Sequence, residues 1–186
     1  MPVVPGKGRL VSCDDVDVEA IFVSGPSGVG KTSILLRLQE RLADPWLFFE
    51  SDRCQPGLPA RRELATTEND RAMTLANVRA VRAYVDAGFR ILAELDVADD
   101  VGRLAVHQEL GSRSRSLVLA CSVETAVHRA STRSPPVSLD FVRAHAAGRD
   151  WEAANSDHVE RTDARALDEV VKALCHWIED APIDRS

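Results

Sequence analysis

Short apolar runs alternate with amphipathic segments along most of the chain. Runs rich in β-branched and aromatic residues predict buried strands at 20–23, 46–49, 89–93, 117–121 and, more weakly, 158–162. Between them, apolar residues recur at helical spacing and predict helices over 33–42, 74–87, 99–110, 123–133, 138–147 and 166–178. Strands that alternate with helices indicate βαβ units. We therefore predict an α/β fold built on a five-stranded parallel sheet flanked by helices.

Length and composition narrow the class of protein. The 186 residues suit one domain, expected over residues 18–186, while residues 1–17 read as a tail or an extra strand. No apolar run approaches the roughly 18 residues of a membrane span, and no secretory signal is visible, so we expect a cytoplasmic protein. The four cysteines are widely separated, which favours reduced thiols over a zinc site.

The charge of the chain points away from nucleic acid. The net charge is −6, whereas a protein that binds phosphate backbones is usually basic. Of the 23 basic residues, only Lys7, Lys31 and Lys172 are lysines. A lysine retained in so arginine-rich a chain is a candidate for a role that arginine cannot fill.

One glycine-rich segment matches the pattern GxxxxGK(S/T) in full. It consists of Gly25, Pro26, Ser27, Gly28, Val29, Gly30, Lys31 and Thr32, and Ser33 follows it. A strand precedes this loop and a helix follows it, so its N–H groups and the helix dipole can face an anion. We predict a nucleoside triphosphate site in which Lys31 reaches the β- and γ-phosphates, Thr32 binds Mg²⁺ and Ser33 faces the α-phosphate.

The remaining motifs favour a small-molecule kinase among the proteins that carry such a loop. No NKxD-type guanine-recognition element follows the third strand, which argues against a GTPase switch. That strand ends in Glu94-Leu95-Asp96 rather than the Asp-Glu pair typical of motor ATPases. A kinase also needs a base for the acceptor hydroxyl and arginines for the transferring phosphoryl group.

Candidates for these parts follow the strands and one helix. Asp52 comes just after the second strand, where a carboxylate faces the ligand crevice and can accept a hydroxyl proton. Glu94 and Asp96 point the same way by strand alternation and can bind a Mg²⁺-bound water or a substrate hydroxyl. Arg129 and Arg133 are four residues apart and suit a lid, around 129–150, that clamps phosphates or stacks on adenine. The alternatives are a capping or solvated aspartate, structural carboxylates and surface arginines.

The residues after the loop resemble those of a known family. Residues 42–52, LADPWLFFESD, are similar to the Leu-x-x-Pro-Trp-Leu-x-Phe-x-x-Asp stretch of the chloramphenicol phosphotransferases. The resemblance continues through Arg71 and Arg90-Ile91 to an R-x-x-x-R lid at Arg129 and Arg133. It implies a P-loop kinase domain with strand order 2-3-1-4-5, ATP as donor and Asp52 as the catalytic base.

Two departures from the family concern the acceptor side. The segment between Pro59 and Arg71 is shortened, and Glu94-Leu95-Asp96 replaces the family's Asp-Asp. We therefore expect ATP- and Mg²⁺-dependent phosphorylation of an antibiotic or a related hydroxylated metabolite, as in antibiotic resistance or self-protection. One alternative is a housekeeping kinase for a sugar, a shikimate-like acid or a nucleotide. A nucleotide acceptor would need a basic pocket, which Arg71 with Arg61-Arg62 would supply. Another is a non-catalytic NTP-binding module.

The last strand completes the expected nucleotide site. Asp163 follows this strand and begins a loop that we expect to border the adenine.

Overall fold

The computed structural model describes residues 18–51, 67–97, 100–134, 137–147 and 155–180. The expected base Asp52, the Arg61-Arg62 pair and the segment 1–17 lie outside the described residues.

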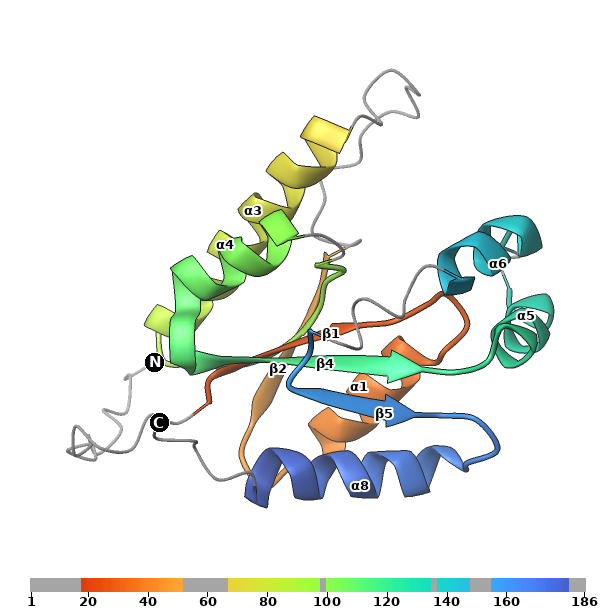
Figure 1. The fold of residues 1–186 in the computed structure, drawn as a ribbon. Coiled ribbons are helices and arrows are strands. Elements are labelled where there is room, and N and C mark those ends of the chain that lie inside the picture. The colour runs from red at the N-terminus through yellow and green to blue at the C-terminus, as the bar shows by residue number, and fades with distance from the viewer. Residues whose placement is uncertain (1–17, 52–66, 98–99, 135–136, 148–154, 181–186) are drawn as a thin grey trace.

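A five-stranded parallel sheet in the order β2-β3-β1-β4-β5 forms the centre of the molecule and confirms the predicted topology (Figure 1). Its strands are β1 (Ala20–Ser24), β2 (Trp46–Glu50), β3 (Arg90–Glu94), β4 (Ser114–Ala120) and β5 (His158–Arg161). The central strand β1 pairs in parallel with both neighbours, so that Phe22 lies opposite Ala93 on one side and Ser116 on the other. All five residues of β1 are buried, as expected for the middle of a sheet that is covered on both faces.

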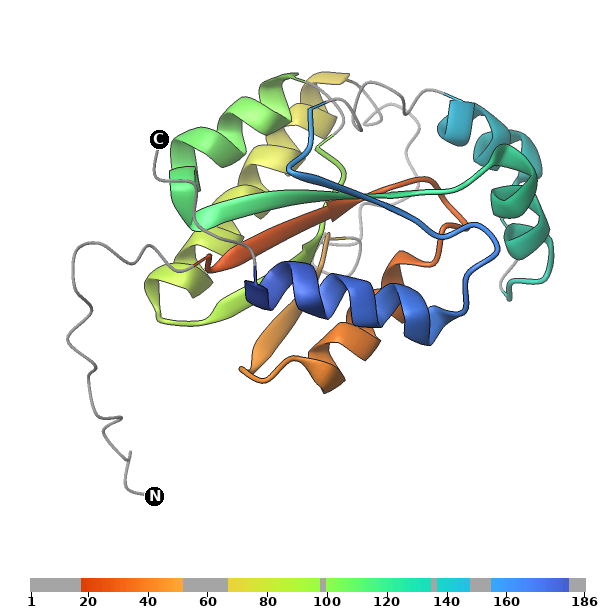
Figure 2. The ribbon, with the colours of Figure 1, turned by 60° about the horizontal axis from the view of Figure 1, so that its bottom comes forward.

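Helices cover both faces of the sheet. On one face lie α3 (Thr67–Asp86) and α4 (Asp100–Leu110), and on the other α1 (Lys31–Arg41) and α8 (Leu167–Asp180) (Figure 2). A short 3-10 turn, η2 (Gly111–Arg113), leads from α4 into β4. Two further helices, α5 (Val123–Ser131) and α6 (Leu139–Ala147), pack on each other beyond the carboxyl end of β4 (Figure 1).

The core has two layers because the side chains of β1 alternate between the faces. Ile21 and Val23 pack with residues of α1 and α8, including Leu38 and Leu174. On the opposite face, Ala20 and Phe22 pack with the cluster that includes residues of α3 and α4. Within the described residues, no helix is both long and apolar enough to span a membrane.

The main difference from the predicted elements is the length of α3. Apolar spacing predicts a helix over 74–87, whereas α3 begins seven residues earlier, at Thr67. Val78, Val81 and Val85 are buried against the sheet as expected. The first half of the helix carries polar residues instead, because that half faces a cavity rather than the core.

Candidate active site

The phosphate loop connects the end of β1 to the start of α1 and is held in place by close backbone packing. At Gly28 the backbone has a φ of +88°, and a Cβ atom there would lie 2.4 Å from the carbonyl oxygen of Ala126 in α5. At Gly25 a Cβ atom would lie 2.5 Å from the carbonyl oxygen of Leu119 in β4. Both positions therefore require glycine, which explains why the sequence pattern is strict here.

Lys31 and Thr32 place their side chains at the carboxyl end of β3. Lys31 Nζ donates to the carbonyl oxygen of Gly25 over 2.8 Å and lies 3.8 Å from Glu94 Oε1. Thr32 Oγ1 donates to the other carboxylate oxygen, Glu94 Oε2, over 3.1 Å. An ammonium, a hydroxyl and a carboxylate thus meet beside the loop, although Lys31 and Glu94 are far apart in sequence.

The start of α1 is suited to an anionic ligand. Its N-cap, Gly30, provides no side-chain hydrogen bond, and the first turn contains no acidic residue. The first N–H groups of a helix have no intrahelical acceptor, so a phosphate can take the place that a capping side chain fills elsewhere. By contrast, Ser122 caps α5, where its hydroxyl accepts a hydrogen bond from the N–H of Thr125.

The residues present also fit a magnesium ion that arrives with phosphate. Thr32 and Glu94 offer oxygen atoms, which are the ligands that Mg²⁺ prefers, alongside those of a nucleotide and of water. Among the described residues, no cluster of three or more His, Cys, Asp or Glu side chains is arranged to hold a metal ion. Thr32 and Glu94 would therefore hold the ion jointly with the nucleotide, whose phosphate charge it would neutralise.

The phosphate loop opens into a cavity of about 760 Å³. One wall is formed by the loop and by the ends of β2 and β3, where Glu50, Glu94 and Asp96 are found. Arg129, Arg133, Phe141 and His145 line the side formed by α5, α6 and the residues after α5. The volume lies in the range of small-molecule sites and accommodates more than a phosphate group.

A further wall of the cavity comes from α3. Asp70, Met73, Thr74 and Asn77 line the cavity from positions three or four residues apart, so they share one face of the helix. Sequence analysis missed these residues, as it missed Phe141 and His145. The sequence signal that could have located them is a set of polar residues at helical spacing just before the apolar positions of the same helix.

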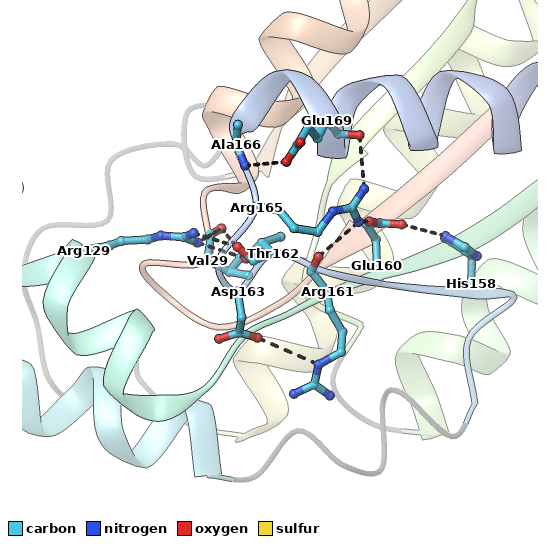
Figure 3. Close-up of polar contacts among 10 residues, drawn as sticks. All are labelled: Val29, Arg129, His158, Glu160, Arg161, Thr162, Asp163, Arg165, Ala166 and Glu169. Carbon is cyan, nitrogen blue, oxygen red and sulfur yellow. Dashed lines mark hydrogen bonds and ion pairs between the residues drawn. The ribbon is translucent and has the colours of Figure 1, made fainter.

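Arg129 lies between the phosphate loop and the end of β5 (Figure 3). Its guanidinium donates to the carbonyl oxygen of Val29 over 3.0 Å and to the hydroxyl and carbonyl oxygens of Thr162 over 2.9 and 2.8 Å. Arg133 follows the end of α5 at Ser131, one turn beyond Arg129, and is exposed. Both arginines line the cavity, but Arg129 is also tied to the backbone of the protein.

Asp163 connects the turn after β5 to the start of α5. The N–H of Ser122 donates to Asp163 Oδ1 over 2.8 Å, and this hydrogen bond lowers the pKa of the carboxyl group. The other oxygen, Oδ2, is buried, has no hydrogen-bond partner and lies 3.8 Å from Arg161 Nε (Figure 3). Asp163 is not among the cavity-lining residues.

Next to this turn, a second polar cluster holds β5 to α8. The buried carboxylate of Glu160 accepts from Arg165, while His158 Nε2 lies 3.3 Å from its other oxygen (Figure 3). The His158 ring stacks on Trp177 of α8 at a centroid distance of 4.8 Å. Burial lowers the pKa of His158. These contacts position β5 and with it Thr162, the partner of Arg129.

Of the other residues predicted to form the site, some line the cavity and some do not. Arg71 is exposed on α3 and is not among the cavity-lining residues, although its neighbour Asp70 is. Ser27 and Ser33 line the cavity, whereas Val29 is buried and is not among the lining residues.

Solved structures of similar fold define the class of protein. The chain aligns over 89% of its length with 96% of a sugar kinase from a Janibacter species, at 20% identity and a TM-score of 0.70. It aligns over 88% with 93% of a gluconokinase from Sinorhizobium meliloti, at 16% identity and a TM-score of 0.69. It also aligns over 86% of its length with 94% of a tunicamycin resistance protein from Deinococcus radiodurans, at 18% identity and a TM-score of 0.56. The fold is that of the P-loop kinases.

The family follows from the sequence. Residues 18–135 match the model of the chloramphenicol phosphotransferase-like proteins, and the chain belongs to this family. It is a small-molecule kinase with an alcohol group as acceptor. No curated protein sequence gives a significant match.

Proposed function

We propose that the protein transfers the γ-phosphoryl group of ATP to a hydroxyl group of an antibiotic or a related metabolite. The observation that carries this proposal is the shared cavity of about 760 Å³, which is lined both by the phosphate loop and by the polar face of α3. A donor bound at the loop would present its terminal phosphate toward the α3 wall. Such an enzyme would work in the cytoplasm, where ATP is available.

The residues divide the chemistry between them. Lys31 and the loop N–H groups bind the phosphates, while Thr32 and Glu94 would hold Mg²⁺, which would neutralise phosphate charge. Asp52 accepts the proton of the acceptor hydroxyl as its oxygen forms a bond to the γ-phosphorus. The bond from that phosphorus to the bridging oxygen breaks, and ADP leaves. Arg129 and Arg133 stabilise the charge on the phosphoryl group during transfer.

The chemistry of the α3 wall favours a hydroxylated acceptor without negative charge. Thr74 and Asn77 offer hydrogen-bonding groups, and Met73 offers an apolar surface. The carboxylates of Asp70, Glu50 and Asp96 line the same cavity, and like charges repel an anionic acceptor. A neutral or cationic alcohol with an apolar portion suits this surface better than a carboxylic or phosphorylated metabolite.

A sugar or sugar-acid kinase is the second candidate, because the sugar kinase and the gluconokinase are similar in fold over most of the chain. The two candidates differ in the acceptor rather than in the donor. The charge of the acceptor therefore separates a gluconokinase-like activity from the proposed one.

The test is an ATP-consumption screen with the purified protein and mass detection of an added phosphoryl group. One arm contains neutral and cationic hydroxylated antibiotics, including chloramphenicol, and the other contains sugars, gluconate and shikimate. We expect transfer in the first arm, loss of transfer but not of ATP binding in Asp52→Asn, and loss of ATP binding in Lys31→Ala. Transfer only to sugars, gluconate or shikimate would overturn the antibiotic proposal. Undiminished turnover by Asp52→Asn would overturn the assignment of Asp52 as the base.

A further inference from the structure

Helix α6 contacts the phosphate loop through the side chain of His145. The N–H of Ser27 donates to His145 Nδ1 over 3.3 Å, across 118 residues of sequence. The other ring nitrogen, Nε2, lies 3.5 Å from Asp96 Oδ2 beyond the end of β3. Phe141, one turn earlier in α6, stacks on the imidazole at a centroid distance of 5.2 Å and an angle of 22°.

The contacts with Ser27 and Asp96 together fit one arrangement of the ring protons. Nδ1 accepts the hydrogen bond of Ser27, so it carries no proton, and Nε2 carries the proton that points to Asp96. The neutral imidazole of His145 therefore takes the position of an anionic oxygen at the N–H of Ser27. Because Ser27 belongs to the loop that cradles phosphates, this donor is one that a bound phosphate would use.

The position of Ser27 indicates which phosphate that is. Lys31 and Thr32 lie at the start of α1, whereas Ser27 precedes them and contacts the ring that extends to Asp96. Asp96, which we expect on the acceptor side, lines the same cavity just beyond the end of β3, so Ser27 and His145 would lie near the end of the triphosphate that faces the acceptor.

We propose that His145 is a specificity-determining residue for the terminal phosphate of the nucleotide. The γ-phosphate takes the N–H of Ser27 from His145, whereas a diphosphate leaves this contact in place. The inference rests on the proposed function, because it requires a nucleotide at the loop. Displacement of the ring releases one contact of α6, so α6 docks more firmly on the loop with a diphosphate than with a triphosphate.

The test compares the binding of two nucleotides by calorimetry. His145→Ala removes the competing acceptor, and we expect it to bind a non-hydrolysable ATP analogue about fivefold more tightly, the effect of one net hydrogen bond. ADP affinity should change by less than twofold. His128→Ala is the matched control, because His128 is an exposed histidine of the neighbouring helix α5. Unchanged or weaker binding of the ATP analogue by His145→Ala would overturn the proposal.

A second measurement follows the contact itself. In the nucleotide-free protein, ¹⁵N NMR of the His145 ring should show an unprotonated Nδ1, and this signal should shift with the ATP analogue or with inorganic triphosphate but not with ADP. If the Nδ1 signal shifts with neither the ATP analogue nor inorganic triphosphate, the proposal is overturned. If the protein binds triphosphates but phosphorylates no acceptor, the proposed function alone fails. If it binds no phosphate ligand, both proposals fail.

Discussion

Thr32 Oγ1 donates a hydrogen bond to Glu94 Oε2 over 3.1 Å, which joins the first turn of α1 to the end of β3. The same carboxylate lies 3.8 Å from Lys31 Nζ through its other oxygen. The sequence left open whether Glu94 or Asp96 serves the metal. The contact with Thr32 favours Glu94 for that role, whereas Asp96 lies beside His145.

Glu94→Gln should therefore impair the dependence on magnesium. The substitution keeps the shape but removes the negative charge that supports a divalent cation, so we expect turnover to fall on the order of a hundredfold. A magnesium titration of the initial rate should show a higher half-saturating concentration. Glu109→Gln, on the outer face of the molecule with Arg79 and Arg82, controls for the loss of a carboxylate. Equal magnesium titrations for the two variants would contradict the assignment.

Two glycines allow the cost of backbone strain to be measured apart from the cost of a steric clash in the phosphate loop. Gly28 and Gly88 have nearly the same φ, +88° and +89°, but a Cβ atom meets the Ala126 carbonyl oxygen only at Gly28. Gly88→Ala should lower the free energy of unfolding by about 1–2 kcal/mol, the cost of a left-handed residue. Gly28→Ala adds a clash, so it should destabilise the protein further and weaken nucleotide binding. Urea unfolding and calorimetry measure both, and equal effects of the two variants would exclude the packing explanation.

Much of the fold was predictable because its signals are local. The strand β1 and the apolar face of α1 appear as short patterns, and the loop motif has a strict spacing. The strand order came from the family resemblance, and the sheet confirms it. Apolar spacing located the second half of α3 through Val78, Val81 and Val85.

The acceptor half of the cavity was less predictable for a physical reason. The first turns of α3 face the cavity with Asp70, Thr74 and Asn77, so hydrophobic periodicity gives no signal there. The contact between Ser27 and His145 depends on how α6 packs at the end of the sheet, and no local pattern encodes it.

Asn77 provides a test of the acceptor side. Asn77 lines the cavity and is buried, so its amide is not exposed on the outer surface of the protein. Asn77→Ala should raise the KM for the acceptor about tenfold, the loss of a buried hydrogen bond, with nucleotide affinity unchanged. Arg79→Ala, an exposed residue on the same helix that pairs with Glu109, is the control. A change in nucleotide affinity instead of acceptor KM would place Asn77 at the donor.

Asp163 makes part of the stability depend on pH. The N–H of Ser122 holds the pKa of Asp163 below its usual value, so the unfolded chain takes up this proton at a higher pH than the folded protein. The stabilisation is complete above the ordinary pKa of an aspartate, near 3.9, and is lost as the pH falls from there through the lowered value. Asp163→Asn should be less stable than the wild type at pH 7, and the gap should close in acid. Urea unfolding over this pH range measures the gap, and a constant gap would show that ionisation is not its source.

Arg129 and Arg133 should respond differently to substitution. Arg129 makes hydrogen bonds to Val29 and Thr162, so Arg129→Ala removes three hydrogen bonds and leaves the Val29 carbonyl oxygen only the weaker bond from the Thr162 hydroxyl, at 3.4 Å. The free energy of unfolding should fall by about 2 kcal/mol. Nucleotide affinity should fall with it, because Val29 belongs to the phosphate loop. Arg133 is exposed and lines the cavity, so Arg133→Ala should change stability by less than about 0.5 kcal/mol.

The effect of Arg133→Ala should lie in catalysis instead. Loss of a guanidinium that stabilises the transferring phosphoryl group should lower kcat on the order of a hundredfold. Urea unfolding and steady-state kinetics of both variants separate the two roles. Arg129→Lys refines the comparison, because one ammonium cannot reproduce the planar fork that reaches both Val29 and Thr162. If Arg129→Ala is as stable as the wild type, its hydrogen bonds do not hold the loop to β5, and Arg129 would act on the nucleotide alone.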